Sequence, residues 1–237
     1  MNIRIIIATL ITAFTATSCS KDSPEPEVQL TKQDSQVVKL SANAAFTTML
    51  SNLTTESKSI DFEAGYFLFP SASQTFRYER VEGKKGEPFI SLQPKGQIGG
   101  VVHCHYNNLF PSYSGSDIKA IYELYIDERL NDYNSFFCGV VSYTGRGYLL
   151  LIEDLGKFLA FSETNFTERE RFRNFELSYF NKQQAHKDSG FESSYEIALA
   201  ELLSGSGLAL YKSNVPFLQW VKLSFENGAT REDKLNK

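Results

Sequence analysis

The stretch HCHYNNLFPSYSGSDI occupies residues 103–118 and follows an apolar, glycine-bounded run. It holds two of the chain's three histidines, His103 and His105. Because successive side chains of a strand point to opposite faces, both imidazoles project together while Cys104 points away. Two neutral imidazoles on one surface are good zinc ligands. The stretch therefore predicts a strand that presents a metal-binding pair.

The second half of the stretch carries Ser114 and Asp117 in an S-x-x-D pattern before a helical apolar run. This pattern is typical of a helix N-terminus, where the serine caps and the aspartate lies near the positive end of the helix. An aspartate held there can also reach back to a metal. Two histidines and one aspartate leave the fourth tetrahedral position to water, which is typical of catalytic zinc. Ser114 can cap the helix or donate a hydrogen bond toward a bound oxyanion.

Strand-like and helix-like runs alternate along the rest of the chain. The expected helices cover residues 41–53, 116–130, 167–180 and 193–205. The expected strands cover residues 60–71, 75–83, 96–106, 135–154 (two strands joined by a TGRG turn), 207–213 and 216–225. Ser41 is a possible helix cap, and Thr167 and Ser193 each begin a capping-box pattern. The interleaving predicts an α/β layered domain.

The first residues resemble an export signal that precedes a lipidated cysteine. Residues 1–18 contain one early positive charge and an apolar run too short to span a bilayer comfortably, followed by small residues before Cys19. This layout resembles the lipobox of bacterial lipoproteins, with Ala16 where leucine is usual. A plain secretory signal and an uncleaved anchor are the alternatives. The polar residues 19–36 are expected to form a flexible tether.

Composition limits the possible partners and the location. A net charge of −4 excludes nucleic acid as the expected partner, because phosphates require a basic surface. A lipid anchor on Cys19 implies attachment to a membrane of the bacterial cell envelope, facing the periplasm or the exterior. There, Cys104 and Cys138 can form a disulfide or remain as two buried thiols, and both alternatives are open.

The motif H-x-H, a short loop with proline, then S-x-x-D at the head of a helix resembles the JAMM (MPN-type) zinc metalloproteases. The resemblance implies that His103, His105 and Asp117 bind Zn²⁺ and that Ser114 stabilises the tetrahedral intermediate. It also implies an upstream glutamate as general base, for which Glu63 in FEAGYFLF is the best match. Four other glutamates, in charged, turn-like surroundings, are the alternatives: Glu56, Glu79, Glu82 and Glu87.

The order of elements matches that family over residues 41 to about 162. We therefore expect a mixed β-sheet flanked by helices, with a JAMM-like domain at 37–165, a C-terminal helical and strand extension packed on it at 166–225, and a frayed tail at 226–237. Eight residues separate His105 from Ser114, one more than in the usual motif, and Tyr106 stands where proline is common.

The function implied by the resemblance is a membrane-anchored zinc metallohydrolase. It would cleave a peptide or isopeptide bond in a peptide or protein substrate through a zinc-activated water. The alternative is a non-catalytic binding or scaffold lipoprotein of JAMM-like fold, since a fold does not determine a function. A structural lipoprotein with coincidental histidines is a third possibility, and it predicts that His103 and His105 share no focus with Asp117.

Overall fold

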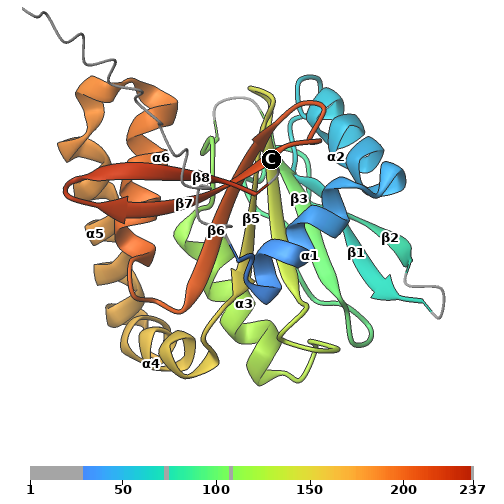
Figure 1. Ribbon diagram of the computed structural model, residues 1–237, viewed down its shortest axis with the longest axis horizontal. Helices are drawn as coiled ribbons and strands as arrows, with labels where there is room; N and C mark the ends of the chain where they lie inside the picture. The colour runs from blue at the N-terminus through green and yellow to red at the C-terminus, as the bar shows by residue number, and fades with distance from the viewer. Residues whose placement is uncertain (1–28, 72–74, 107–108, 236–237) are drawn as a thin grey trace, which may run out of the picture.

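One continuous β-sheet organises the molecule (Figure 1). The computed structural model describes residues 29–71, 75–106 and 109–235. The sheet has eight strands in the order β2-β1-β3-β4-β5-β6-β7-β8. Strands β3 and β4 run parallel, and the other neighbouring strands are antiparallel. The predicted α/β class with a mixed sheet and flanking helices is confirmed.

The strands follow the apolar runs of the sequence, with short turns between several of them. Their bounds are β1 (Ala64–Pro70), β2 (Phe76–Glu82), β3 (Gly100–His105), β4 (Phe137–Ser142), β5 (Arg146–Ile152), β6 (Leu208–Asn214), β7 (Trp220–Glu226) and β8 (Ala229–Lys234). The β4–β5 hairpin forms at the TGRG turn, where Gly145 has φ +97°. That left-handed conformation favours glycine.

Helices cover both faces of the sheet. Their bounds are α1 (Lys32–Ser41), α2 (Ala44–Glu56), α3 (Gly115–Ile126), α4 (Leu155–Phe166), α5 (Arg169–Ala185) and α6 (Phe191–Leu203), with a short 3₁₀ helix at Lys187–Ser189. Helices α1 and α2 bury Val37 and Phe46 against one face. Helices α3 to α6 pack against the other face in a larger core that contains Ile118 and Phe175. The two cores give a three-layer arrangement.

Strand β3 lies between these two cores and is buried along its whole length. Val101 belongs to the core on the α3 side, and Cys104 belongs to the core on the α2 side. Because side chains alternate, His103 and His105 face the α3 side. Cys138 belongs to the core opposite Cys104, and both thiols are free. The disulfide alternative is therefore wrong, because the two side chains project from opposite faces of the sheet.

Parts of the predicted tether and tail belong to regular elements in the structure. Helix α1 begins at Lys32, inside the expected tether of residues 19–36, because its capping box and buried Val37 anchor it to the sheet. Helix α2 is capped by Asn43, and the expected cap Ser41 is instead the last residue of α1. Within the expected frayed tail of residues 226–237, Ala229–Lys234 form β8, which pairs with the free edge of β7.

The C-terminal helices also differ from the sequence prediction. Helix α4 was not expected, and it is capped by Asp154. Thr167 ends α4 and donates its hydroxyl to the Glu163 carbonyl, so it does not cap α5, whose N-cap is Glu168. Ser193 lies inside α6, whose N-cap is Gly190. The S/T-x-x-E pattern is short enough to occur inside helices and at their ends, where packing decides its role.

Cys19 and the whole export signal lie outside the described residues. Within the described part of the chain, none of the helices combines the length and the apolar character needed to span a bilayer.

Candidate metal centre

Three elements meet at the end of β3 and carry the candidate residues. Strands β1 and β3 pair with Gly65 opposite His103 and Ala64 opposite Cys104, so Glu63 lies beside the end of β3. A Cβ atom on Gly65 would stand 2.3 Å from the Val102 carbonyl oxygen. Only glycine lets the two backbones approach this closely. The close pairing of these strands brings Glu63 next to the histidines.

The head of α3 supplies Asp117 through the predicted capping box, which the structure confirms. The Ser114 hydroxyl oxygen accepts a hydrogen bond from the Asp117 backbone N–H at 3.3 Å. In return, Asp117 Oδ2 accepts hydrogen bonds from the Ser114 backbone N–H at 2.7 Å and from its hydroxyl at 2.8 Å. These reciprocal bonds hold the carboxylate at the helix N-terminus, with Oδ1 directed at His103.

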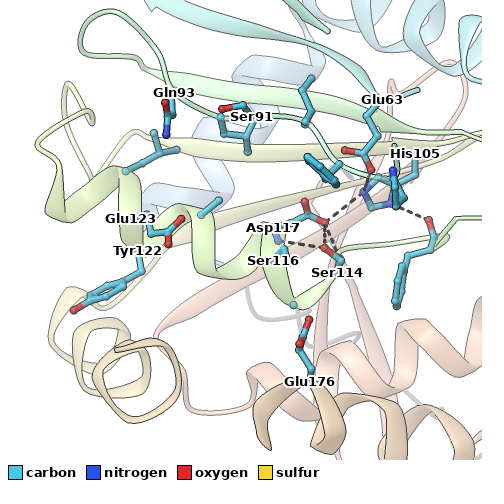
Figure 2. A pocket seen from close by; sticks show the side chains of 18 of the residues that line it. Glu63, Ser91, Gln93, His105, Ser114, Ser116, Asp117, Tyr122, Glu123 and Glu176 are labelled. Atoms are coloured by element: carbon cyan, nitrogen blue, oxygen red, sulfur yellow. Dashed lines mark hydrogen bonds and ion pairs between the residues drawn. The ribbon is translucent and has the colours of Figure 1, made fainter. Parts of the chain in front are cut away.

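The side chains of Glu63, His103, His105 and Asp117 converge on one focus, and Figure 2 labels Glu63, His105 and Asp117 at this place. The Nε2 atoms of His103 and His105 are 3.1 Å apart. Asp117 Oδ1 lies 3.1 Å from His103 Nε2, and Asp117 Oδ2 lies 3.4 Å from His105 Nε2. Glu63 Oε1 approaches His105 Nε2 to 3.5 Å (Figure 2). All four side chains are buried. A structural lipoprotein with coincidental histidines predicts that His103 and His105 do not converge with Asp117. The observed convergence contradicts that prediction.

Glu63, His103 and His105 form a buried group that can hold a metal ion. Their ligand atoms all lie within 4.8 Å of one another. Imidazole nitrogens together with carboxylate oxygens are a ligand set that suits zinc and other first-row transition metals. Around a tetrahedral zinc with metal–ligand distances of about 2.0–2.1 Å, ligand atoms are ~3.3 Å apart. The 3.1 Å separations of His103 Nε2 from His105 Nε2 and from Asp117 Oδ1 fit that spacing.

A hydrogen bond from Nδ1 sets the orientation of the His105 imidazole. His105 Nδ1 lies 2.9 Å from the Phe110 carbonyl oxygen, to which it donates a hydrogen bond. This bond leaves Nε2 facing the cluster, as in metal sites where the second imidazole nitrogen donates to a carbonyl. His103 Nδ1 is buried and has no hydrogen-bond partner among the described residues.

Burial and charge shift the titration of three members of the cluster. Burial raises the pKa of the Glu63 carboxyl, against the lowering effect of His105 and His103. For His105, burial favours the neutral form, but Asp117, Glu63 and the Phe110 carbonyl outweigh it and raise the pKa to about 9. Burial also opposes ionisation of Asp117, yet the two histidines hold its pKa well below the usual range. Groups shifted in this way cluster at functional sites.

The alternative glutamates lie away from the focus. Each is paired with a basic side chain: Glu56 and Glu82 with Arg80, Glu79 with Arg77, and Glu87 with Lys84. Glu63 alone among the five joins the histidine pair.

A cavity of about 980 Å³ opens onto the cluster. Glu63, His105, Ser114 and Asp117 line its inner end. Its volume lies at the upper end of the range for ligand pockets. The cavity extends along α3, between that helix and residues 88–94 (Figure 2). The cluster is therefore buried from bulk solvent but accessible from the cavity.

The C-terminal extension lines this cavity and does not plug it. Glu176, Tyr179 and Phe180 of α5 and Tyr195 of α6 contribute to its wall. Sequence reasoning missed these residues because the fold brings them to the site from a part of the chain with no motif. The one available signal is the spacing of Glu176, Tyr179 and Phe180, which places them on one face of a helix.

Comparisons with protein-family models, with curated proteins and with solved structures found no match to this chain.

Proposed function

We propose that the protein is a zinc metallohydrolase that cleaves a peptide or isopeptide bond. One observation carries the proposal: two histidines and two carboxylates, all buried, converge at the inner end of a cavity large enough for a peptide segment. The JAMM-like order of motifs supports the same reaction class. The candidate substrate is a peptide or protein, and the proposal includes no nucleic acid.

His103, His105 and Asp117 are proposed to hold the zinc. Asp117 Oδ2 is occupied by Ser114, so Oδ1 is the oxygen left for the metal. When bound, zinc acts as a Lewis acid that lowers the pKa of water and polarises the substrate carbonyl. The hydrogen bond from His105 Nδ1 to Phe110 keeps the His105 Nε2 lone pair directed at the focus.

Glu63 is the proposed general base. Burial raises the pKa of its carboxyl, which makes it a better proton acceptor than an exposed glutamate. Glu63 takes a proton from the attacking water as the C–O bond forms. It then delivers that proton to the leaving amine as the C–N bond breaks, so the carboxylate is regenerated.

Ser114 is proposed to stabilise the oxyanion. Its hydroxyl now donates to Asp117 Oδ2, and that oxygen keeps the Ser114 backbone N–H as a second donor. The hydroxyl can therefore turn toward substrate while Asp117 stays held. Preorganised donors of this kind lower the barrier of acyl transfer.

The test combines metal analysis with hydrolysis of a mixed peptide pool. We expect one zinc per chain, loss of zinc in Asp117→Ala, and loss of hydrolysis with zinc retained in Glu63→Gln. The control is Glu79→Gln, an exposed glutamate paired with Arg77, which should keep both properties. A folded wild-type protein that binds no zinc would refute the proposal.

A non-catalytic metal-binding module is the second candidate, and one observation favours it. The group whose ligand atoms lie mutually within 4.8 Å contains Glu63 and not Asp117. If Glu63 is a metal ligand, the site has lost its base. Glu63→Gln would then lose zinc, and the wild-type protein would bind zinc without hydrolysing peptides.

We also propose that Cys19 carries a lipid that anchors the protein in the bacterial cell envelope, facing the periplasm or the exterior. The proposal rests on the residues before Cys19, which resemble a lipobox. In a bacterial host, Cys19→Ser should move the protein from the membrane fraction to the soluble fraction. Unchanged membrane association would contradict the anchor.

A further inference from the structure

Exposed apolar side chains gather at the cavity of the candidate metal centre. Ten large apolar side chains are exposed in the described part of the chain, and four of them line this one cavity: Phe89, Phe110, Ile126 and Phe180. Phe110 is 40% exposed and Phe180 is 56% exposed. Contiguous exposed apolar surface marks places where ligands or partners bind.

Helix α5 builds one side of the cavity from the C-terminal extension. Glu176, Tyr179 and Phe180 lie three and four residues apart, so they share one face of the helix. That face lies against the head of α3, because a Cβ atom on Gly115 would stand 3.1 Å from Glu176 Cγ. The extension thus reaches the residue next to Ser114.

Four rings form what we call the aromatic wall: Phe110, Tyr179, Phe180 and Tyr195. The Phe110 ring lies 5.2 Å from the Tyr195 ring and 6.5 Å from the Tyr179 ring, measured between centroids. Tyr179 is buried, and its hydroxyl donates to the Tyr113 carbonyl at 3.0 Å. Because Tyr179 is buried and hydrogen-bonded, its ring has a fixed position in the aromatic wall. The partly exposed rings of Phe110 and Phe180 line the cavity.

The aromatic wall begins beside the candidate metal centre. The backbone carbonyl of Phe110 accepts the hydrogen bond from His105 Nδ1. Ser114 follows Phe110 by four residues and lines the same cavity. A group bound on the wall is therefore held next to the atoms proposed to carry out hydrolysis.

The charges around the cavity disfavour acidic groups at this position. The lining residues hold five carboxylates and one guanidinium, that of Arg129. Glu176 lies at the α5 side, close to Ser114 (Figure 2). An anionic side chain on the aromatic wall would face a lining in which carboxylates outnumber basic groups.

We infer that the aromatic wall is a substrate subsite for a large apolar side chain, preferably aromatic, next to the scissile bond. This inference rests on the proposed function and specifies its substrate class: peptides with a bulky apolar residue and no acidic residue at that position. Three observations carry it. They are the exposed rings, their continuity with the candidate centre, and a cavity volume sufficient for several residues.

The test measures binding without relying on metal or turnover. N-acetyl-phenylalaninamide, N-acetyl-alaninamide and the α-amide of N-acetyl-aspartic acid, which keeps its side-chain carboxylate, are titrated into metal-free protein and followed by ligand-observed NMR. Burial of a phenylalanine ring predicts that the first amide binds at least about tenfold tighter than the second. The aspartate amide should bind most weakly of the three.

Two variants of α5 locate the binding. Phe180→Ala should reduce the preference for the phenylalanine amide several-fold, because it removes exposed ring surface. Leu177→Ala is the matched control, since Leu177 is exposed on the same helix and does not line the cavity. It should leave the preference unchanged. Equal binding of the three amides to the wild-type protein, or equal effects of the two variants, would overturn the inference.

The two proposals fail separately. If the protein binds zinc and hydrolyses peptides but shows no preference among the amides, the subsite is wrong and the hydrolase stands. If the amides bind with the expected preference and no zinc is found, the aromatic wall binds apolar groups. In that case both the hydrolase proposal and the inference of a substrate subsite are wrong.

Discussion

The imidazole Nδ1 of His105 lies 2.9 Å from the carbonyl oxygen of Phe110. The Phe110 ring in turn lies against Tyr179 and Tyr195, from helices α5 and α6. The C-terminal extension thereby braces the loop that orients a proposed zinc ligand. A part of the chain that carries no motif of its own is thus tied to the candidate centre.

Tyr179→Phe tests this brace. The change removes the hydroxyl that donates to the Tyr113 carbonyl at 3.0 Å, while the ring stays. We expect a loss of about 1 kcal/mol in the free energy of unfolding, measured in urea. We also expect zinc affinity, measured by competition with a chelator, to fall by up to about tenfold, since partners of a ligand tune binding. Tyr133→Phe, at an exposed tyrosine, is the control. Unchanged zinc affinity in Tyr179→Phe would show that the brace acts on stability alone.

Ser114→Ala separates capping from oxyanion stabilisation. Loss of the cap should cost about 1 kcal/mol of stability. Loss of an oxyanion donor should lower kcat by about 10²-fold. Thr31→Ala is the matched control, because Thr31 and Asp34 form the same capping box at the head of α1. It should show a similar loss of stability and full activity per folded molecule. Equal activities of the two variants would leave Ser114 with the capping role only.

Gly65→Ala tests the close pairing of β1 and β3. The new methyl group would stand 2.3 Å from the Val102 carbonyl oxygen and 2.9 Å from His103 Cα, so the strands must separate. We expect a destabilisation of about 1–3 kcal/mol and weaker zinc binding. At Gly156 in α4, the nearest atom to a new Cβ is 3.5 Å away. Gly156→Ala should therefore be neutral or stabilising by up to about 1 kcal/mol. Thermal unfolding of both variants provides the measurement, and similar melting temperatures would argue against close strand packing at Gly65.

Asp34→Asn tests how the N-terminal helix is held to the sheet. Burial favours protonation of Asp34, but hydrogen bonds from Thr31 and Tyr211 and the charge of Lys222 hold the pKa of its carboxyl below the ordinary value. A lowered folded-state pKa contributes stability that is present above the unfolded pKa, about 3.9, and is lost as pH falls through the folded pKa. We expect Asp34→Asn to cost about 2 kcal/mol at pH 7.

That cost should shrink as the pH of urea unfolding is lowered toward ~3. The control is Asp188→Asn, at an exposed position in the short 3₁₀ helix. It should have little effect at either pH. A cost of Asp34→Asn that is the same at both pH values would contradict the charge-based account.

Several local features followed from the sequence alone. The alternation of His103 and His105 against Cys104, the capping box of Ser114 and Asp117, and the β4–β5 hairpin were predicted and are confirmed. Each depends on residues within a few positions of one another. Strand pleating, helix capping and turn geometry act over that range, so a short pattern suffices to predict them.

The predictions that were wrong depend on contacts between residues far apart in the chain. Thr167 and Ser193 also begin a capping-box pattern, but Thr167 is the C-cap of α4 and Ser193 lies inside α6. Strand β8 has a polar, charged sequence and is a strand because β7 offers an unpaired edge. In these cases the outcome depends on partners far away in the chain, which local patterns do not contain.

The sequence by itself determined the mixed α/β class, the shared face of the two histidines and the place of Asp117 at a helix head. Only the tertiary structure decided that Glu63, and none of the other four glutamates, reaches the histidines. It also decided that α5 and α6 wall the cavity. The physical reason is that backbone geometry propagates over a few residues. Side chains from distant segments meet only where strand pairing and the burial of apolar faces bring them together.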